Sequence, residues 1–179
     1  FQSSLSAYRV EVLSVERVQN ETLWDTFAAK KQTMLAMLGA TVDKCERSLF
    51  HGTDEDTAPK IVAQGFNRSF NGKNATMYGK GVYFAKEAEY SARDIYSKPN
   101  ARGERFMFLC RVLVGDYCLG KQDAVTPDPR PGSAVDLYDS TVDNVQDPKI
   151  NPKPSSHTTT RRCTRSISSS SSSTRRCEI

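Results

Sequence analysis

Apolar and polar residues alternate near the start of the chain. The segment Tyr8-Arg9-Val10-Glu11-Val12 changes character at every position, and Leu13, Val15 and Val18 prolong the apolar series. A period of two places successive side chains on opposite faces of an extended backbone, so that one face can be buried. The sequence therefore predicts a strand from Tyr8 to Val18.

The next segment has the spacing of an amphipathic helix. Asn20 suits the N-cap position, acidic Glu21 suits the first turn, and Gly39 suits the C-terminal cap. Apolar side chains recur between these ends at helical intervals, at Leu23, Trp24, Phe27, Met34, Leu35 and Leu38. We expect this helix to cover one face of a sheet, with Trp24 in the core.

The rest of the pattern predicts short elements. Tight turns are indicated where glycines occur, and near-continuous β-prone runs indicate buried strands. The predicted elements are a strand at Ser48–Phe50, a helical segment at Thr57–Gln64, a strand at Val82–Phe84, a helix at Lys86–Tyr96 and a central strand at Arg105–Val114, buried on both faces.

Two segments have the composition of loops. Residues 67–78 are rich in Asn, Gly, Ser and Lys, and Pro127, Pro129 and Pro131 interrupt a later stretch. Because the first segment follows the His51 region, it is a candidate lid over a bound ligand. An ordinary surface loop would have the same composition.

Length and charge indicate one domain with a distinct tail. The chain has 179 residues, the length of a single domain. Residues 1–150 carry 19 Lys or Arg against 20 Asp or Glu, whereas residues 151–179 carry 6 against 1. Nucleic-acid binding by the folded part is not expected, because such proteins carry their positive charge on the folded body.

The five cysteines and two histidines do not form a metal-binding pattern. The cysteines are scattered without a CxxC pair, so no metal site is predicted, and such a set suits a reducing compartment. No apolar run is long enough to cross a bilayer, and the start lacks a signal-peptide pattern. We expect a protein of the nucleus or cytoplasm without a membrane partner and, since the chain starts at Phe1, a fragment of a larger protein.

Three separated motifs resemble those of one enzyme family. They are His51-Gly52-Thr53, the segment Gly79-Lys80-Gly81-Val82-Tyr83-Phe84-Ala85, and Tyr90-Ser91-Ala92 followed by Tyr96. In this order and spacing they are similar to the catalytic domain of the poly(ADP-ribose) polymerase superfamily, and within it to the mono-ADP-ribosyltransferase branch. The resemblance, which covers residues 8–150, implies an α+β ADP-ribosyltransferase fold with a split antiparallel β-sheet core and flanking helices.

The resemblance also implies a site for NAD+, the ADP-ribose donor. His51 would bind the adenosine ribose, while the Gly52 backbone and the Ser91 hydroxyl would pair with the nicotinamide carboxamide. Tyr83 and Tyr96 would pack on the nicotinamide ring, and His51 and Tyr83 are the implied catalytic residues. The complete implied NAD+-binding set is His51, Gly52, Thr53, Tyr83, Tyr90, Ser91 and Tyr96.

The implied reaction is transfer of ADP-ribose from NAD+ to a protein acceptor, with release of nicotinamide and without a metal. In chain-elongating members a glutamate on the final strand completes the catalytic triad, and the context of Glu178 does not match it. Without that carboxylate we expect single units rather than polymer. A second hypothesis is a catalytically inactive nucleotide cleft or scaffold that binds protein partners, and a third is a binding protein that works through its basic tail.

Residues 151–179 depart from the family pattern. They form a Ser- and Arg-rich stretch whose composition is typical of a disordered tail. With the reading frame shifted by one base, Pro154 to Ser169 can encode FVTYNDTQVYPEYLI, a strand followed by a terminal segment of the family's kind. We hypothesise a frameshift product, with a natural serine-rich splice tail as the alternative. The catalytic domain would then end, incomplete, at Ile150, and the last strands of the fold would be absent.

Overall fold

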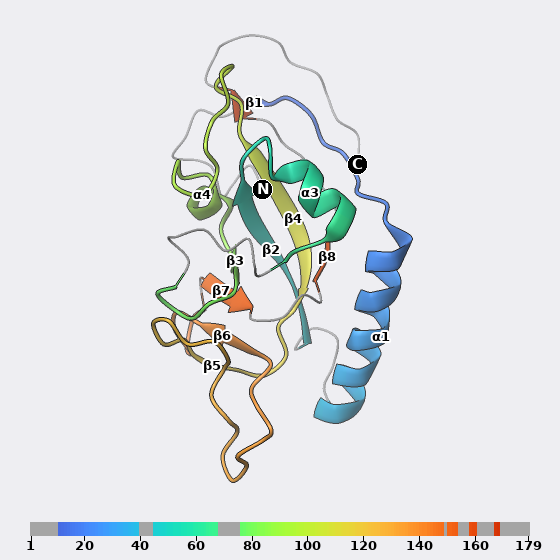
Figure 1. The fold of residues 1–179 in the computed structure, drawn as a ribbon, viewed down its shortest axis with the longest axis vertical. Helices are drawn as coiled ribbons and strands as arrows, with labels where there is room; N and C mark the ends of the chain where they lie inside the picture. Colours follow the sequence, from blue (N-terminus) through green and yellow to red (C-terminus); the bar gives the residue numbers. More distant parts are fainter. Residues whose placement is uncertain are drawn as a thin grey trace.

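A five-stranded antiparallel sheet forms the centre of the molecule (Figure 1). The computed structural model describes residues 11–39, 45–67, 76–148, 150–153, 158–160 and 167–168. The strands of the sheet follow the order β7-β3-β2-β4-β8, and each neighbouring pair is antiparallel. This architecture agrees with the α+β fold that the sequence predicts.

The longest pairing in the sheet joins β2 (Glu46–Thr53) to β4 (Phe106–Leu113). All eight residues of β2 have a partner in β4, and His51 lies opposite Phe108. The predicted strand at Arg105–Val114 is thereby confirmed. The strand β2 is longer than its prediction, because it continues through the His51-Gly52-Thr53 motif and so places that motif inside the sheet.

Three of the remaining strands were not predicted from the sequence. The sheet continues through β3 (Val82–Ala85) to β7 (Ile150–Lys153) on one side and to β8 (Thr158–Thr160) on the other, while β1 (Glu11–Val12) pairs with β9 (Ile167–Ser168). The expected absence of the last strands is wrong for the described segments β7, β8 and β9, which pair as strands. The disordered tail stays a prediction. The backbone groups along β3 and β4 need partners, and any extended backbone can supply them. The boundary at residue 150 and the frameshift origin stay predictions.

Helix α1 (Glu21–Leu38) has the predicted ends. The Asn20 side chain accepts a hydrogen bond from the Leu23 amide at 3.1 Å, and Gly39 adopts the left-handed conformation of a C-terminal cap, with φ 54°. The prediction of a core position for Trp24 is wrong. Its side chain is 43% exposed, because Phe27 and Met34 take the buried positions on the helix. No helix in the described ranges is long and apolar enough to span a membrane.

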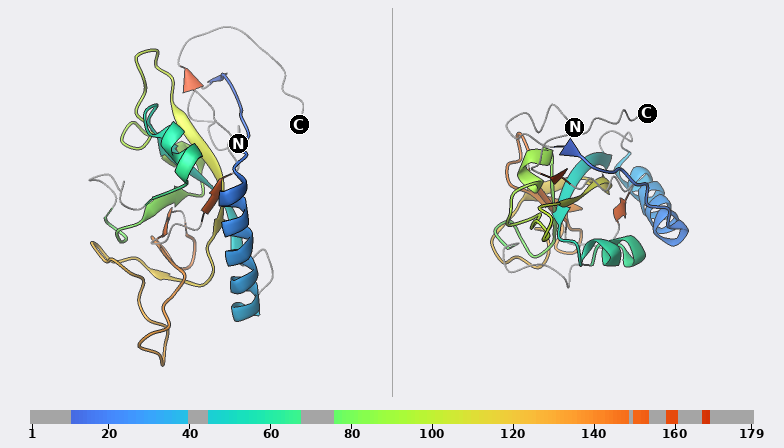
Figure 2. Two further views of the ribbon diagram at one scale, coloured as in Figure 1. Left: turned by 45° about the vertical axis from the view of Figure 1, so that its right-hand side comes forward. Right: turned by 90° about the horizontal axis from the view of Figure 1, so that it is seen from above.

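Ion pairs tie α1 to the sheet beneath it. The Glu46 carboxylate on β2 accepts hydrogen bonds from Lys31 of α1, at 2.7 Å, and from the guanidinium of Arg111 on β4. The Arg111 guanidinium also lies over the rings of Trp24 and Phe27, 5.3 Å from each centroid. Figure 2 shows α1 along one side of the sheet and, from above, α4 (Ala88–Ser91) toward the opposite side.

Two predicted elements are shorter than expected. Within the described residues the first strand is reduced to Glu11–Val12, since its partner β9 is only two residues long. The helix predicted at Lys86–Tyr96 is helical only over α4, after which the chain continues in turns to Tyr96. Helix α3 (Ala58–Gln64), in contrast, matches its prediction, with Pro59 in its first turn and Gly65 at its C-terminal end.

The hydrophobic core lies between the sheet and α3. Ala58 and Ile61 of α3 pack with residues of β2, β3 and β4, and Phe66 closes the group after the helix. The buried sheet residues of this cluster are Leu49, Val82, Phe84, Phe108, Cys110 and Val112. This core supports the face of β2 from which His51 projects.

A smaller sheet lies at the base of the molecule. The strand β5 (Tyr117–Leu119) runs parallel to β6 (Ser140–Val142), and the long segment between them extends away from the body (Figure 1). The Arg130 guanidinium holds that segment together through ion pairs with Asp116, at 2.5 Å, and Asp139, at 2.9 Å. The proline-rich stretch is therefore an ordered excursion from this small sheet.

Candidate functional site

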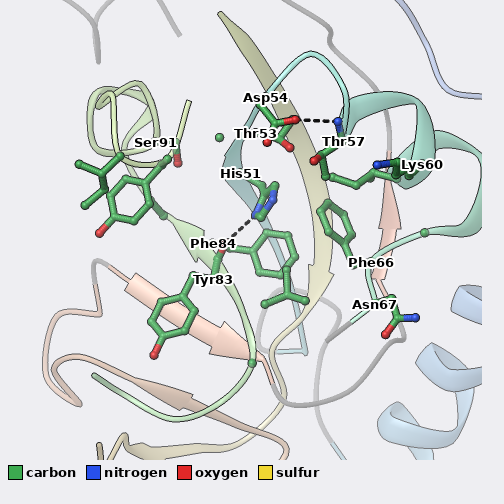
Figure 3. Close-up of a pocket in the computed structure, with 18 of the residues that line it drawn as sticks. His51, Thr53, Asp54, Thr57, Lys60, Phe66, Asn67, Tyr83, Phe84 and Ser91 are labelled. Carbon is green, nitrogen blue, oxygen red and sulfur yellow. Dashed lines mark hydrogen bonds between the residues drawn. The ribbon is translucent and has the colours of Figure 1, made fainter. Parts of the chain in front are cut away.

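All seven residues predicted for the NAD+ site line one cavity. Its volume is about 280 Å³, and its walls come from β2, β3, α3 and the segment from Tyr90 to Tyr96 (Figure 3). Small-ligand sites commonly have volumes from roughly 300 to 1,000 Å³, so this cavity is close to the lower end. The predicted residues that line it are His51, Gly52, Thr53, Tyr83, Tyr90, Ser91 and Tyr96.

A close backbone contact shapes one wall of the cavity. A Cβ atom added at Gly52 would collide with the carbonyl oxygen of Ser91 and would lie 3.2 Å from the carbonyl carbon of Tyr96. Ser91 is buried, and its hydroxyl donates to the carbonyl of Phe50 at 3.1 Å. Only glycine allows this approach. With its proton engaged by Phe50, the Ser91 hydroxyl can still accept a hydrogen bond from a ligand amide.

The His51 ring is held in one orientation. Its Nδ1 lies 2.8 Å from the carbonyl oxygen of Tyr83, as the dashed line in Figure 3 shows. A carbonyl oxygen only accepts hydrogen bonds, so Nδ1 must carry the proton. In the neutral ring Nε2 is then an acceptor. The ring packs edge-on against Phe66, with centroids 4.8 Å apart, and in a tilted arrangement against Phe84, with centroids 5.5 Å apart.

These surroundings keep His51 neutral. Burial lowers the pKa of His51 below its ordinary value of 6.5, and the bond to the Tyr83 carbonyl, which favours the charged form, offsets only part of that effect. At neutral pH the side chain therefore offers an unprotonated Nε2. A sugar hydroxyl could donate to this atom, whereas an anion could not be bound by it.

We predict that ligand binding weakens in acid because of His51. Nε2 accepts a hydrogen bond only in the neutral ring, so affinity for ADP-ribose should be constant above pH 6.5 and should fall once the pH passes below the lowered pKa. The unfolded chain takes up this proton first, near pH 6.5, so the free energy of unfolding should also decrease as the pH falls below that value. Calorimetric titration across this pH range measures the first effect.

A His51→Asn variant provides the control, since its amide does not titrate. It should bind more weakly than the parent at pH 7 and show no further loss attributable to this position in acid. An unchanged acid loss in the variant would assign the pH dependence to another group.

The Tyr83 hydroxyl closes a turn rather than pointing freely into the cavity. It donates to the carbonyl of Gly79 at 2.7 Å and accepts from the amide of Tyr78 at 2.9 Å. Burial raises the pKa of Tyr83, so the phenol stays protonated at neutral pH. The position of its ring therefore depends on the turn from Tyr78 to Gly79.

Tyr90 and Tyr96 form a stacked pair on another wall. Their hydroxyls lie 2.7 Å apart, and their ring centroids 5.1 Å apart at an interplanar angle of 27°. The guanidinium of Arg93 lies over the Tyr90 ring, 4.5 Å from its centroid. Burial and the bond to Tyr96 raise the pKa of Tyr90. Fixed aromatic faces of this kind suit a flat heteroaromatic ring, cationic ones above all.

Sequence reasoning missed the wall that α3 provides. Its N-cap residue and three of its helical residues line the cavity at helical spacing, namely Thr57, Lys60, Ile61 and Gln64. The i, i+3, i+4, i+7 pattern was visible in the sequence, but nothing in it indicated which side the stripe would face. Asp54 also lines the cavity, and its carboxylate accepts from the Thr57 amide at 2.7 Å, which fixes the start of the helix.

Some predicted features lie outside the described residues. Of the candidate lid at 67–78, only Asn67 and the part from Thr76 onward are described, and Asn67 lines the cavity. The mismatched Glu178 also lies outside. Over the described ranges, no group of three or more His, Cys, Asp or Glu side chains could hold a metal ion.

Known proteins with similar sequences are ADP-ribosyltransferases. Human "Protein mono-ADP-ribosyltransferase PARP14" is 45% identical over 151 residues, which cover 84% of this chain and 8% of that protein. Mouse "Protein mono-ADP-ribosyltransferase PARP10" is 41% identical over 152 residues, covering 84% of this chain and 16% of that protein. The chain thus spans only a small part of the length of these relatives.

A solved structure with a similar fold and a matching family model agree with these sequence similarities. The structure resembles the crystal structure of the PARP domain of Arabidopsis RADICAL-INDUCED CELL DEATH1, with a TM-score of 0.75 and 22% identity, over 94% of this chain and 93% of that one. That likeness concerns the fold alone. The sequence model of the poly(ADP-ribose) polymerase catalytic domain matches residues 2–166. Since that match covers most of the 179 residues, the chain belongs to the poly(ADP-ribose) polymerase catalytic domain family.

Proposed function

We propose that this chain transfers single ADP-ribose units from NAD+ to a protein acceptor and releases nicotinamide. The observation that carries the proposal is the convergence of His51, Gly52, Tyr83, Ser91 and Tyr96 on one cavity in a member of this family. The names of the relatives, which are mono-ADP-ribosyltransferases, support the choice of single units.

The cavity offers the groups that a nicotinamide carboxamide needs. Gly52 exposes its backbone at the point where β2 meets Ser91, and the Ser91 hydroxyl can accept from the carboxamide NH2. Tyr83 and the Tyr90–Tyr96 pair supply aromatic surface for the ring. Binding of the carboxamide would hold the nicotinamide as a leaving group while its glycosidic bond breaks.

Cleavage of the glycosidic bond depends mainly on how the protein positions NAD+ and the acceptor. The positive charge of the nicotinamide ring already activates the bond, and the electrons of the breaking bond return to the ring as nicotinamide leaves. The sugar becomes oxocarbenium-like and is attacked by the acceptor nucleophile. Holding the two partners in line and excluding water therefore supplies most of the expected acceleration.

The lining of the cavity favours single units over polymer. Elongation needs a base that activates a ribose hydroxyl. Among the lining residues that the structure describes, Asp54 is the only carboxylate, and it is engaged in capping the start of α3. A protein acceptor that brings its own nucleophilic side chain does not need that base.

Mass spectrometry of an acceptor protein after incubation with NAD+ tests the proposal. We expect nicotinamide release together with additions of one ADP-ribosyl unit per modified side chain. Chains of ADP-ribose on one side chain would contradict the mono-transfer part. Nicotinamide release without any addition would indicate hydrolysis of NAD+ rather than transfer.

Lys60 provides the positive charge for the dinucleotide phosphates in this proposal. It is the only lysine or arginine among the described residues that line the cavity, and Figure 3 shows it on α3, above Phe66. None of the ion pairs found among the described residues involves Lys60. The pyrophosphate of NAD+ carries two negative charges, which the Lys60 ammonium at this wall would complement.

We predict that Lys60→Gln weakens NAD+ binding while leaving nicotinamide binding intact. Loss of one charged contact at a partly exposed site should lower NAD+ affinity by roughly 3- to 10-fold, and the difference should shrink at high salt. Calorimetric titrations with NAD+ and with nicotinamide at two salt concentrations measure both effects. Lys98→Gln removes the same charge from an exposed residue outside the cavity and should bind like the parent. Equal losses in the two variants would exclude a specific role for Lys60.

A further inference from the structure

A buried hydroxyl on β6 contacts the turn that positions Tyr83. Thr141 is only 6% exposed, and its hydroxyl donates to the carbonyl of Tyr78 at 3.0 Å. Thr141 does not line the cavity of the candidate site. Its hydrogen-bond partner Tyr78 nevertheless contacts the site, because the Tyr78 amide donates to the Tyr83 hydroxyl.

These contacts form a continuous chain into the site. The Thr141 hydroxyl binds the Tyr78 carbonyl, the Tyr78 amide binds the Tyr83 hydroxyl, and that hydroxyl binds the Gly79 carbonyl. Four polar groups of one short turn are thus ordered together. A shift of the Tyr78 backbone would move both hydrogen-bond partners of the Tyr83 hydroxyl, the Tyr78 amide and the Gly79 carbonyl. The Tyr83 ring, which lines the cavity, would move with them.

The segment 120–124 also contacts this turn. The amide of Lys80 donates to the carbonyl of Ala124 at 2.7 Å, and the amide of Asp123 donates to the carbonyl of Thr76 at 2.8 Å. Gly120 packs so closely on Tyr78 that an added Cβ atom would lie 2.7 Å from its Cα atom. Thr141 supplies the side-chain hydrogen bond to the Tyr78 carbonyl.

We propose that Thr141 is a positioning residue for Tyr83, and through it for the nicotinamide half of the donor. The inference rests on the proposed function for its ligand, but the ordering of the turn can be measured without any ligand. Thr141 acts through the peptide of Tyr78, so its loss changes where the Tyr83 ring lies and leaves the adenosine side of the cavity unaltered.

The strand β6 offers a matched control for the test. Ser140, the preceding residue, is also buried, and its hydroxyl donates to the carbonyl of Val114 at 2.9 Å. Ser140→Ala therefore removes a comparable buried hydrogen bond from the same strand without touching Tyr78. Thr141→Val removes the hydroxyl at almost constant volume, and Thr141→Ser retains it.

Two measurements on these variants decide the question. The first is hydrogen exchange of the Tyr78 amide without ligand, which should be about ten-fold faster in Thr141→Val and unchanged in Thr141→Ser and Ser140→Ala. The second is affinity for nicotinamide, which should fall by about 5- to 10-fold in Thr141→Val only. Affinity for adenosine should be the same in all four proteins.

The outcomes separate the positioning role from the proposed function. Unchanged Tyr78 exchange in Thr141→Val, or equal losses in Ser140→Ala, would overturn the role of Thr141. Faster exchange with no nicotinamide binding by the parent protein would support the ordering of the turn and contradict the proposed function instead. If Thr141→Ser bound nicotinamide as weakly as Thr141→Val does, the hydroxyl would not be the group that positions Tyr83.

Discussion

Replacing Gly52 with alanine is expected to abolish binding of nicotinamide and of NAD+. The added methyl group would collide with the Ser91 carbonyl oxygen and would also approach the carbonyl carbon of Tyr96 to 3.2 Å. These are backbone atoms, so no side-chain rotation can relieve the contact. The wall that holds Ser91 and Tyr96 would have to move away from β2, and we expect a loss of affinity of more than about 100-fold.

Calorimetric titration with nicotinamide measures the loss, and thermal denaturation shows whether the variant is folded. Gly39→Ala is the control, because Gly39 also has a special role, as the cap of α1 with φ 54°, but has no neighbour within 4 Å of an added Cβ atom. It should lose stability and retain affinity. A Gly52→Ala protein that binds nicotinamide as the parent does would show that the carboxamide does not lie at this wall.

Replacing Phe66 with alanine is expected to lower the stability strongly and to change the titration of His51. Phe66 is 4% exposed and contacts the rings of His51, Phe84 and Phe108 at centroid distances of 4.8, 5.1 and 6.1 Å. Truncation of a buried phenylalanine costs about 3 to 5 kcal/mol, a large part of a typical stability of roughly 5 to 15 kcal/mol. The opened space would admit water beside the imidazole.

The pKa of His51 should therefore rise toward 6.5 in Phe66→Ala, because burial is the main cause that lowers it. Nuclear magnetic resonance of the imidazole protons follows this change, and denaturant unfolding follows the stability. Phe27→Ala, which removes an equally buried ring from α1, should cost similar stability and leave the His51 titration unchanged. The same pKa shift in both variants would indicate general loosening rather than local shielding by Phe66.

The elements that were predicted correctly are those set by local chemistry. Asn20 and Gly39 fix the ends of α1 through hydrogen bonding and a left-handed backbone, and both act within a few residues of the chain. The apolar run of β4 likewise needs no distant information to indicate a buried strand. Helix ends and buried strands of this kind can be predicted from the residues of the segment itself.

The errors concern positions that distant partners decide. Trp24 belongs to the apolar stripe of α1, but Phe27 and Met34 fill the interface and Arg111 of the sheet stacks on the exposed indole. The strands β7, β8 and β9 form because β3, β4 and β1 present unpaired backbone to them. Neither outcome can be derived from the composition of the segment itself.

The residues of the candidate site also divide into those that local motifs predict and those that distant contacts place there. The seven predicted residues came from motifs that resemble a family, and the structure places all of them on one cavity. Lys60 was missed because its position at that cavity depends on how α3 packs against β2. Asp54 directly follows the predicted motif at the end of β2, so its neighbours in the sequence could have indicated it. Thr141 was missed because it acts through the Tyr78 peptide, more than sixty residues earlier in the chain.

The most direct test of this account is to incubate the protein with NAD+ and an acceptor protein, and to follow nicotinamide release together with the intact mass of both proteins. We expect nicotinamide release to equal the number of ADP-ribosyl units added, with one unit at each modified side chain, and we expect neither from Gly52→Ala. NAD+ that binds with no release of nicotinamide would contradict the account, and so would modification that persists undiminished in Gly52→Ala.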